Sequence, residues 1–212
     1  MNNTKEQLVK LPFWDKLDNR QKEYATHHAG IRYYEKNNIM HGRGNSCLGM
    51  IYVIKGEIRV FMLSEEGREI TLFRLEKGDS CVLSSACVIE EITFDTQMIA
   101  EKDCEIMVVN SVAFAQLAKE NIYAKCFMYE LATKRFSAVM FTMQMILFAK
   151  FDQRLATFLL SEYDKTGICE IRMTHEQIAQ QVNSAREVVA RMLKRFVSDG
   201  LVELKRGSVI LK

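Results

Sequence analysis

The first half of the chain alternates apolar and polar residues with a period of two, and glycine residues separate the alternating runs. In residues 58–63, Ile58, Val60 and Met62 alternate with Arg59, Phe61 and Leu63, and a turn that contains Gly67 leads into a second run at residues 70–75. Further runs occupy residues 91–99 and 104–109. Alternation of this period is typical of strands with one buried face. The pattern predicts a jelly roll or small β-barrel over residues 1–111.

The pattern changes after Gly78, because no glycine or proline follows until Gly167. Residues 113–148 place mostly apolar side chains at alternating intervals of four and three, the heptad pattern of a helix that packs against another helix. One helix of about 35 residues would be about 50 Å long and would extend beyond a small domain. We therefore predict a parallel dimer seam over residues 112–147; the alternative is a helix packed on its own domain. The heptad positions are Ile122, Cys126, Tyr129, Thr133, Phe136, Met140, Met143 and Leu147.

Residues 148–212 carry the signals of a winged helix-turn-helix. A helix is predicted over residues 151–163 and a short strand over 168–173. The residues THEQ at 174–177 are a capping box, so the next helix should begin at His175. Asn183-Ser184 predicts a tight turn that caps a second helix over residues 185–198. The last twelve residues, LVELKRGSVILK, predict a β-hairpin, or wing, with its turn at Arg206-Gly207.

The second helix of this pair exposes a face whose side chains fit the base edges of DNA. Arginine can donate two hydrogen bonds to guanine, glutamate can accept one from cytosine, and alanine fits against the methyl group of thymine. We predict base reading by Arg186, Glu187, Ala190 and Arg191. A solvated helix face is the alternative, but the capping box, the two-helix spacing and the basic wing favour DNA. Contacts with the DNA backbone are predicted for Thr174, Ser184, Lys205 and Arg206.

Charge and hydropathy narrow the setting in which the protein works. The chain of 212 residues has a net charge of +2, but residues 172–212 hold eight Lys and Arg against four Asp and Glu. This basic C-terminal segment supports a nucleic-acid partner. No apolar run approaches the roughly 20 residues that cross a bilayer, and the N-terminus has no apolar core of a signal peptide. We expect a cytoplasmic protein with no membrane contact.

The sequence resembles the Crp/Fnr family of transcription regulators, both in the predicted barrel and near the C-terminus. The resemblance is carried by YVIKGEIRVFMLSEEGREITLFRLEKGD in the predicted barrel and by FDQRLATFLL, THEQIA and SAREVVARMLKRF near the C-terminus. It implies a jelly-roll sensor, a dimerisation helix and a winged helix-turn-helix, an α+β fold. It also implies a homodimer on double-stranded DNA that reads a palindromic TGTGA-like site, contact with RNA polymerase, and a small-molecule effector. Activator or repressor action and the polymerase-contacting residues stay open.

The effector is the part that the resemblance leaves open. Relatives that bind cyclic AMP carry a Gly-Glu pair and an Arg-Ser pair in a phosphate-binding cassette, whereas the same stretch reads GDSCVLSSACVIEEITFDTQMIA here. It has no Arg and no Gly-Glu pair, so we expect a branch without the cassette and no cyclic AMP. The stretch predicts an apolar, sulfur-rich pocket for a neutral or aromatic metabolite or for haem. Its predicted wall is Cys81, Val82, Leu83, Ser84, Ser85 and Cys87, followed by Val88 and Ile89.

Cysteine and histidine positions bear on three alternative mechanisms. No cysteine precedes Cys47, so the N-terminal cysteine cluster of the oxygen-sensing branch is missing and no iron-sulfur cluster is expected. His27, His28 and His41 leave open a haem-based gas sensor, although a surface role is the alternative for each. Six cysteines leave open a redox switch. An enzyme built on a cupin-like barrel is not expected, because no His-x-His motif is present.

Overall fold

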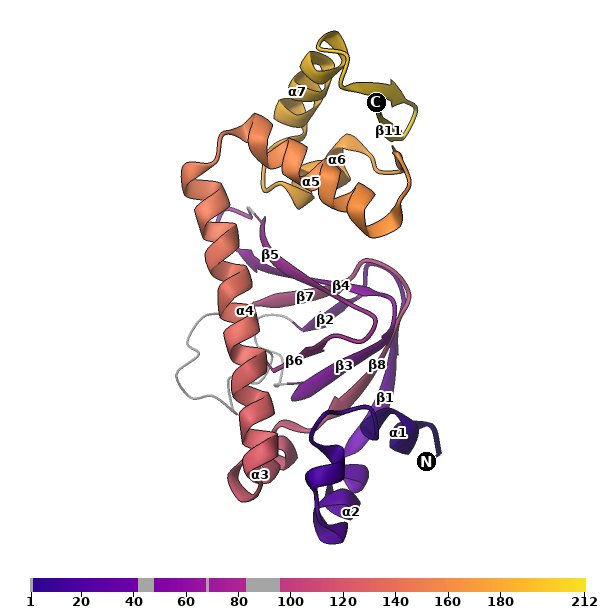
Figure 1. The fold of residues 1–212 in the computed structure, drawn as a ribbon, viewed down its shortest axis with the longest axis vertical. Helices are drawn as coiled ribbons and strands as arrows, with labels where there is room; N and C mark the ends of the chain where they lie inside the picture. Colours follow the sequence, from indigo (N-terminus) through magenta and orange to yellow (C-terminus); the bar gives the residue numbers. More distant parts are fainter. Residues whose placement is uncertain (1, 42–47, 68, 83–95) are drawn as a thin grey trace. The chain divides into compact units, whose positions relative to one another are not determined.

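The computed structural model describes residues 2–41, 48–67, 69–82 and 96–212 (Figure 1). The chain divides into two compact units. The first combines Met1–Leu63 with Leu72–Met140, and the second combines Ser64–Thr71 with Phe141–Lys212. Each unit has hydrophobic clusters of its own, two in the first and one in the second. Along the described residues, no helix is long and apolar enough to cross a membrane.

The first unit begins with two short helices and continues as a β-rich domain. Helix α1 spans Asn2–Leu8 and α2 spans Asn19–His27, with a 3-10 turn at Trp14–Lys16 between them. The strands of the domain form two antiparallel four-stranded sheets of order β1-β8-β3-β6 and β2-β7-β4-β5. Their bounds are β1 Ala29–Tyr34, β2 Ile39–His41, β3 Met50–Lys55, β4 Glu57–Leu63, β5 Glu69–Glu76, β6 Ser80–Cys81, β7 Gln97–Ala100 and β8 Cys104–Val109.

The alternating pattern produces these sheets because it places one apolar face on each strand. Ile58 and Val60 of β4 are fully buried beside Val53 and Ile106 of the other sheet, in one cluster. The predicted strand at residues 104–109 coincides with β8. Of the predicted strand at residues 91–99, residues 97–99 lie in β7 and Thr96 precedes that strand, while residues 91–95 lie outside the described residues. The predicted order of a β-rich domain, a long helix and a helix-turn-helix is confirmed.

The tight link between β3 and β4 depends on Gly56. Its φ of 96° lies in the left-handed region, and a Cβ at this position would lie 2.5 Å from the carbonyl oxygen of Asp103 and 2.6 Å from Sγ of Cys104. A larger residue would therefore be strained in its backbone and would collide with the turn before β8.

The predicted single helix over residues 113–148 is wrong, since the structure has two helices there. Helix α3 spans Ser111–Glu120 and α4 spans Ile122–Phe148. Asn121 between them is extended, with φ −128° and ψ 119°. Its side-chain oxygen accepts hydrogen bonds from the backbone N–H groups of Tyr123 and Ala124 at 3.0 and 3.2 Å. An asparagine side chain that caps a new helix competes with continuation of the old one, and the heptad pattern begins only after this break.

The second unit contains a winged helix-turn-helix. Its elements are α5 Phe151–Thr166, β9 Glu170–Ile171, α6 His175–Gln181, α7 Arg186–Ser198, β10 Val202–Lys205 and β11 Ser208–Leu211. The three strands form one antiparallel sheet of order β10-β11-β9. Leu155 and Leu159 of α5 pack with Val189 and Leu193 of α7 in the core of this unit. Gly167 ends α5 in a left-handed conformation, as the sequence predicts.

Two details of this unit differ from the sequence-based expectations. The strand expected over residues 168–173 contains only Glu170–Ile171, because β11 pairs with it at two positions. Ser184 was expected to cap α7, but the residue at the N-cap is Ala185, which has no side-chain hydrogen bond. The turn is one residue longer than expected: Asn183 adopts a left-handed φ of 52°, and the Ser184 N–H donates to the carbonyl oxygen of Ala179 at 3.0 Å.

Candidate nucleic-acid interface

Helix α7 is amphipathic, and its polar face carries the predicted base-reading residues. Val189, Leu193 and Phe196 are buried in the unit's core. Arg186, Glu187 and Arg191 are exposed, and Ala190 is half-buried. Residues three or four positions apart are neighbours on a helix surface. This spacing places Ala190 beside Arg186 and Glu187, and Arg191 beside Glu187. In the described part of the chain, none of the three charged side chains forms an ion pair. They are therefore available to another molecule.

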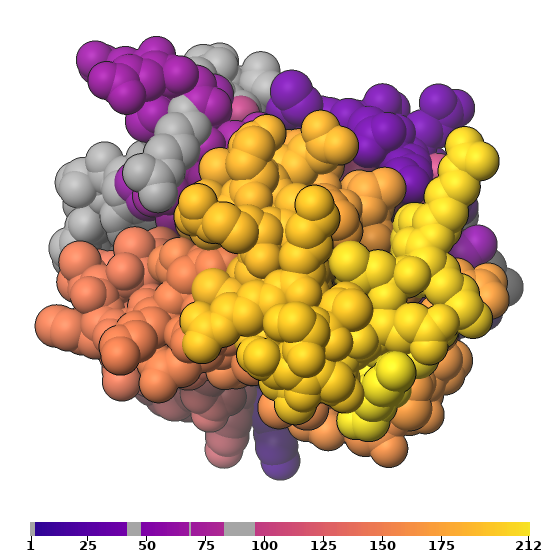
Figure 2. Space-filling model, turned by 90° about the horizontal axis from the view of Figure 1, so that it is seen from above, coloured from indigo at the N-terminus to yellow at the C-terminus, as the bar shows by residue number. Residues whose placement is uncertain are grey.

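A groove of about 550 Å³ lies between the start of α6, the start of α7 and the wing. Four of the predicted DNA-contacting residues, Thr174, Arg186, Lys205 and Arg206, line this one groove. Three of them are cations, and Glu176 is the one acidic residue among the groove's lining. The structure thus brings together residues that are separated by up to 32 positions in the sequence. Figure 2 shows the atoms of residues 150–212, coloured orange to yellow, as one continuous surface.

Local hydrogen bonds hold the α6 side of this groove in position. The Gln177 N–H donates to Oγ1 of Thr174 at 3.2 Å, and the Thr174 N–H donates to Oε1 of Gln177 at 2.8 Å. The predicted capping box is therefore present, and α6 begins at His175 as predicted. Because Oγ1 of Thr174 is the acceptor, its own hydroxyl hydrogen remains available for a second partner.

The wing is attached to β9 through Glu170. The Ser208 hydroxyl donates to Oε1 of Glu170 at 2.9 Å, and Nη2 of Arg172 lies 3.1 Å from Oε2. The Ser208 hydrogen bond and the Arg172 guanidinium together lower the pKa of the Glu170 carboxyl. This carboxylate remains ionised at neutral pH and fixes the base of the basic hairpin beside the groove.

Several predicted residues lie outside the groove's lining, and one lining residue was missed. Glu187, Ala190 and Arg191 continue along α7 away from the groove, and Ser184 is half-buried in the turn. His175 lines the groove but was not predicted as a contact. The capping box could have indicated this residue. The first residue after an N-cap lies at the positive end of the helix, where a phosphate is favoured.

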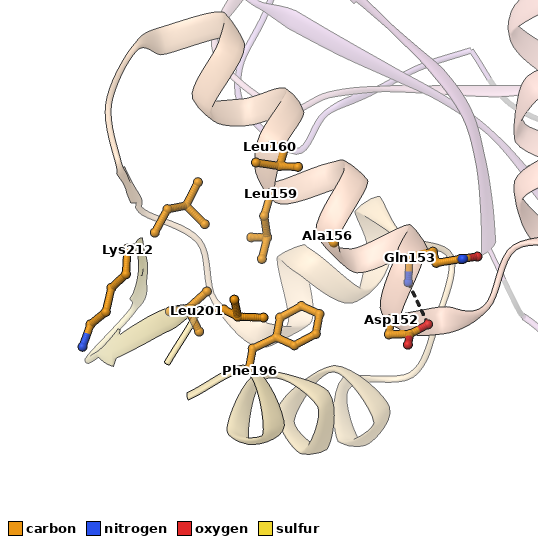
Figure 3. A pocket seen from close by; sticks show the side chains of 10 residues that line it. Asp152, Gln153, Ala156, Leu159, Leu160, Phe196, Leu201 and Lys212 are labelled. Carbon is orange, nitrogen blue, oxygen red and sulfur yellow. Dashed lines mark hydrogen bonds between the residues drawn. The ribbon is translucent and has the colours of Figure 1, made fainter. Parts of the chain in front are cut away.

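A second cavity of the same unit is apolar and has a different character. It measures about 400 Å³ and lies between α5, the end of α7 and the last two strands (Figure 3). Figure 3 shows Leu159 and Phe196 directed into it, with Asp152 and Lys212 at its margins. Its walls continue the hydrophobic core of the winged helix, and it shares no lining residue with the basic groove.

Helix α4 has two faces with opposite surroundings. One face packs on the β-rich domain and buries Ala124, Phe127, Met128, Leu131 and Arg135. The other face is the heptad stripe, which is exposed along its length. Phe136 is 65 % exposed, and the other large apolar members of the stripe lie between 43 and 62 %. A row of exposed apolar side chains on this scale is typical of a protein interface.

The predicted effector wall is only partly within the described residues. Cys81 and Val82 are fully buried, whereas Leu83, Ser84, Ser85, Cys87, Val88 and Ile89 lie outside them. Among the described cysteines, Cys81 and Cys104 are buried and Cys126 and Cys169 are exposed. Burial raises the pKa of the Cys104 thiol, which donates to the carbonyl oxygen of Lys102 at 3.0 Å. A raised pKa disfavours the reactive thiolate at this position.

The histidines named for haem binding lie in two places. His27 and His28 are neighbours at the end of α2 with ring centroids 5.9 Å apart, and His41 ends β2. Nδ1 of His28 is bound to the carbonyl oxygen of Tyr24 at 2.9 Å. Within the described ranges, no three His, Cys, Asp or Glu side chains gather as a metal site would require.

Comparison with known proteins identifies the family. The model of the Crp-like helix-turn-helix domain matches residues 153–212, and that of the cyclic nucleotide-binding domain matches residues 31–121. The crystal structure of a transcriptional regulator of the Crp/Fnr family from Eubacterium rectale is 35 % identical in sequence. It covers 96 % of this chain and 94 % of its own, with a TM-score of 0.89. The chain belongs to the Crp/Fnr family.

Relatives with lower sequence identity to this chain cover most of its length, and one of known structure has a similar fold. The cAMP-activated global transcriptional regulator CRP of Pasteurella multocida is 24 % identical over 89 % of this chain and 93 % of its own length. The c-di-GMP-responsive regulator CLP of Xanthomonas campestris has a TM-score of 0.74 at 20 % identity, covering 92 % of this chain and 99 % of that one. These relatives are transcription regulators and not enzymes, in agreement with the sequence-based expectation.

The family assignment settles the general function and corrects one expectation. This Crp/Fnr member is a transcription regulator with an effector-binding domain and a helix-turn-helix DNA-binding domain. Regulators of this family bind DNA and act as dimers. The expectation that its sensor lacks the cyclic-nucleotide cassette is wrong, because the match at residues 31–121 includes that stretch.

Proposed function

We propose that this regulator binds, as a homodimer, a palindromic DNA site with TGTGA-like half-sites and that an effector in the β-rich domain controls this binding. The observation that carries the proposal is the groove formed by Thr174, Arg186, Lys205 and Arg206 beside the exposed face of α7. The groove supplies cations suited to phosphates. The exposed face of α7 supplies Arg186, Glu187 and Arg191, which are suited to base edges. RNA polymerase is the expected partner at the promoter, and no residue is assigned to that contact.

The exposed stripe of α4 supports the dimer. Its members follow the heptad spacing that pairs helices, and α4 has already buried its opposite face on its own domain. A two-fold dimer would present its two α7 helices to successive major grooves, with half-site centres about 34 Å apart. This spacing predicts a palindrome with one helical turn between its half-site centres.

Within each half-site we assign base reading to Arg186, Glu187, Ala190 and Arg191. The two arginines should contact guanines, and Glu187 should accept from a cytosine amine on the opposite strand. Thr174, Ser184, Lys205 and Arg206 are assigned to the DNA backbone. The domains proposed for these tasks are residues 1–111 for sensing, 112–147 for dimerisation and 148–212 for DNA binding.

The test is the binding of an Arg191→Ala variant to a TGTGA palindrome and to single-base substitutions of it. We expect a loss of about 1 to 3 kcal/mol in specific binding, with relaxed preference at one guanine. Arg195→Ala is the matched control, because Arg195 lies one turn further along α7 and its Nε is 3.7 Å from Asp199 Oδ2. Unchanged base preference in the Arg191 variant would contradict the assignment of this residue.

Two alternative proposals keep the same DNA-binding unit but differ in what controls it. In one, the regulator senses a gas through haem; in the other, it senses redox state through a cysteine switch. An absorption spectrum with metal analysis, recorded on protein purified with and without oxygen, separates them. A Soret band at about 400 nm would indicate haem. A featureless spectrum would favour an organic effector or a thiol switch.

A further inference from the structure

Backbone hydrogen bonds fix the walls of the apolar cavity in the winged-helix unit (Figure 3). The N–H of Leu201 donates to the carbonyl oxygen of Phe196 at 2.9 Å, and the N–H of Lys212 donates to that of Leu201 at 3.1 Å. Gly200 makes the turn after α7 in a left-handed conformation, with φ 74°. These contacts hold the end of α7 and both ends of the wing together, so the cavity is formed before any ligand arrives.

The cavity is apolar both at its inner wall and at its rim. Leu159 and Phe196 are buried and point into it. Leu160 and Leu201 also line it, but they are 56 and 54 % exposed. Its volume of about 400 Å³ lies within the range of roughly 300 to 1,000 Å³ that small-molecule sites occupy. Exposed apolar side chains gathered at the rim of such a cavity are typical of a binding site.

The cavity has one fixed charge, and that charge is negative. Asp152 and Lys212 are the two charged residues of its lining. Asp152 is half-buried, and its Oδ1 accepts a hydrogen bond from the backbone N–H of Gln153 at 2.9 Å. In the part of the chain that the structure describes, no cation forms an ion pair with Asp152. Lys212 is exposed, and an exposed ammonium on a flexible side chain contributes little to binding.

We propose that this cavity binds a small amine with an aromatic or branched aliphatic body, whose ammonium group pairs with Asp152. The body fills the space between Leu159 and Phe196, which removes apolar surface from water. The half-buried carboxylate favours a cation over a neutral or anionic group at the same place. This is a second ligand site, distinct from the effector site proposed in the β-rich domain, and its ligand contacts the helix that presents the proposed base-reading residues.

The test measures the binding of matched ligands to the full-length protein by calorimetry. Phenethylamine and isopentylamine represent the two kinds of amine. Phenethyl alcohol and isopentyl alcohol replace the ammonium by a neutral hydroxyl, and phenylacetate and isovalerate carry the opposite charge. We expect at least one amine to bind at least about tenfold more tightly than its alcohol and its carboxylate.

The role of the charge is tested at Asp152. Asp152→Asn should reduce the affinity for that amine to about that of its alcohol, because the charge is lost while the apolar walls remain. Asp164→Asn is the matched control, since it removes an exposed carboxylate from the same helix. It should leave the affinity for the amine within about threefold of the wild type.

The role of the cavity is tested by filling it. Ala156 lines the cavity from α5, and Ala156→Phe should weaken the binding of amine and alcohol alike at least about tenfold. Thr157→Phe is the control, because it adds the same side chain at an exposed position outside the lining. If the Ala156 variant does not fold, Leu160→Gln removes apolar surface at the exposed rim and should also weaken both ligands.

Three results would overturn the proposal. The first is that neither amine binds. The second is that an alcohol or a carboxylate binds as tightly as its amine. The third is that the folded variants at Asp152 and at the cavity walls bind the amine like the wild type.

Discussion

Thr174 and Gln177 exchange two hydrogen bonds across the first turn of α6, each using its side chain to bind the other's backbone N–H. This reciprocal pair fixes where α6 begins and places Thr174 at the edge of the basic groove. One residue therefore stabilises the helix and faces the proposed DNA backbone.

Replacing Thr174 by alanine should lower the free energy of unfolding by about 1 kcal/mol, because the Gln177 N–H loses its acceptor. It should also weaken DNA binding if the hydroxyl hydrogen donates to a phosphate. Thr174→Ser keeps the hydroxyl and should restore most of both properties. Urea unfolding and DNA titration of both variants measure the two effects; equal stability of the alanine variant and the wild type would contradict the capping role.

Two copies of α4 that pair along the heptad stripe should bring their Cys126 residues together. Cys126 is exposed in the single chain and occupies a heptad position. A short bis-maleimide should therefore link the wild type into covalent dimers, and Cys126→Ser should prevent this. Cys169→Ser is the control, because Cys169 is also exposed but lies in the winged-helix unit. Linking that depends on Cys169 and not on Cys126 would exclude the α4 seam.

The wing should contribute affinity without sequence preference. Lys205 and Arg206 line the groove beside α7, and removing one cation that binds a phosphate should reduce the slope of log affinity against log salt by about 1. Lys205→Ala and Arg206→Ala should weaken binding to all sequences alike. Lys119→Ala removes an exposed cation from α3 and should leave the slope unchanged. A wing variant with altered base preference would instead place that residue on the bases.

The ion pairs of Asp79 with Lys134 and Arg135, at 3.0 and 3.5 Å, should make part of the stability depend on acid pH. Burial favours the neutral form of Asp79, but the N–H of Glu76 and the two cations outweigh it, so the pKa of the carboxyl is lowered in the folded chain. Its contribution is therefore present above the pKa of the unfolded chain and is lost as the pH falls through the lower folded value. The unfolded value is about 3.9. Asp79→Asn should reduce the melting temperature at pH 7, and the difference from the wild type should shrink below about pH 4.

The matched control for this experiment is Asp164→Asn, which removes an exposed carboxylate from α5. Its melting temperature should follow that of the wild type across the whole pH range. A constant difference between Asp79→Asn and the wild type from pH 7 to pH 3 would show that the ion pairs of Asp79 do not act on stability.

The sequence by itself determined the elements whose signals are local. The capping box at Thr174, the stop at Gly167 and the wing turn at Gly207 lie where the sequence predicts them, because each depends on hydrogen bonds and dihedral angles within a few residues. The alternation in β4 and the heptad spacing of α4 are also local signals, because each is a periodic pattern within a single element. These signals were sufficient for the order of the main elements and for the exposed charged face of α7.

Only the tertiary structure decided which distant residues meet. Asn121 gave no clear sign that it would divide the helical region, because an asparagine caps a helix only when the preceding chain can turn away. Lys134 and Arg135 are adjacent and chemically alike, yet one is exposed and the other is buried against Ser80 and Phe73. That difference depends on the direction in which α4 packs on the sheet domain, and packing between segments far apart in sequence leaves no local pattern to predict it.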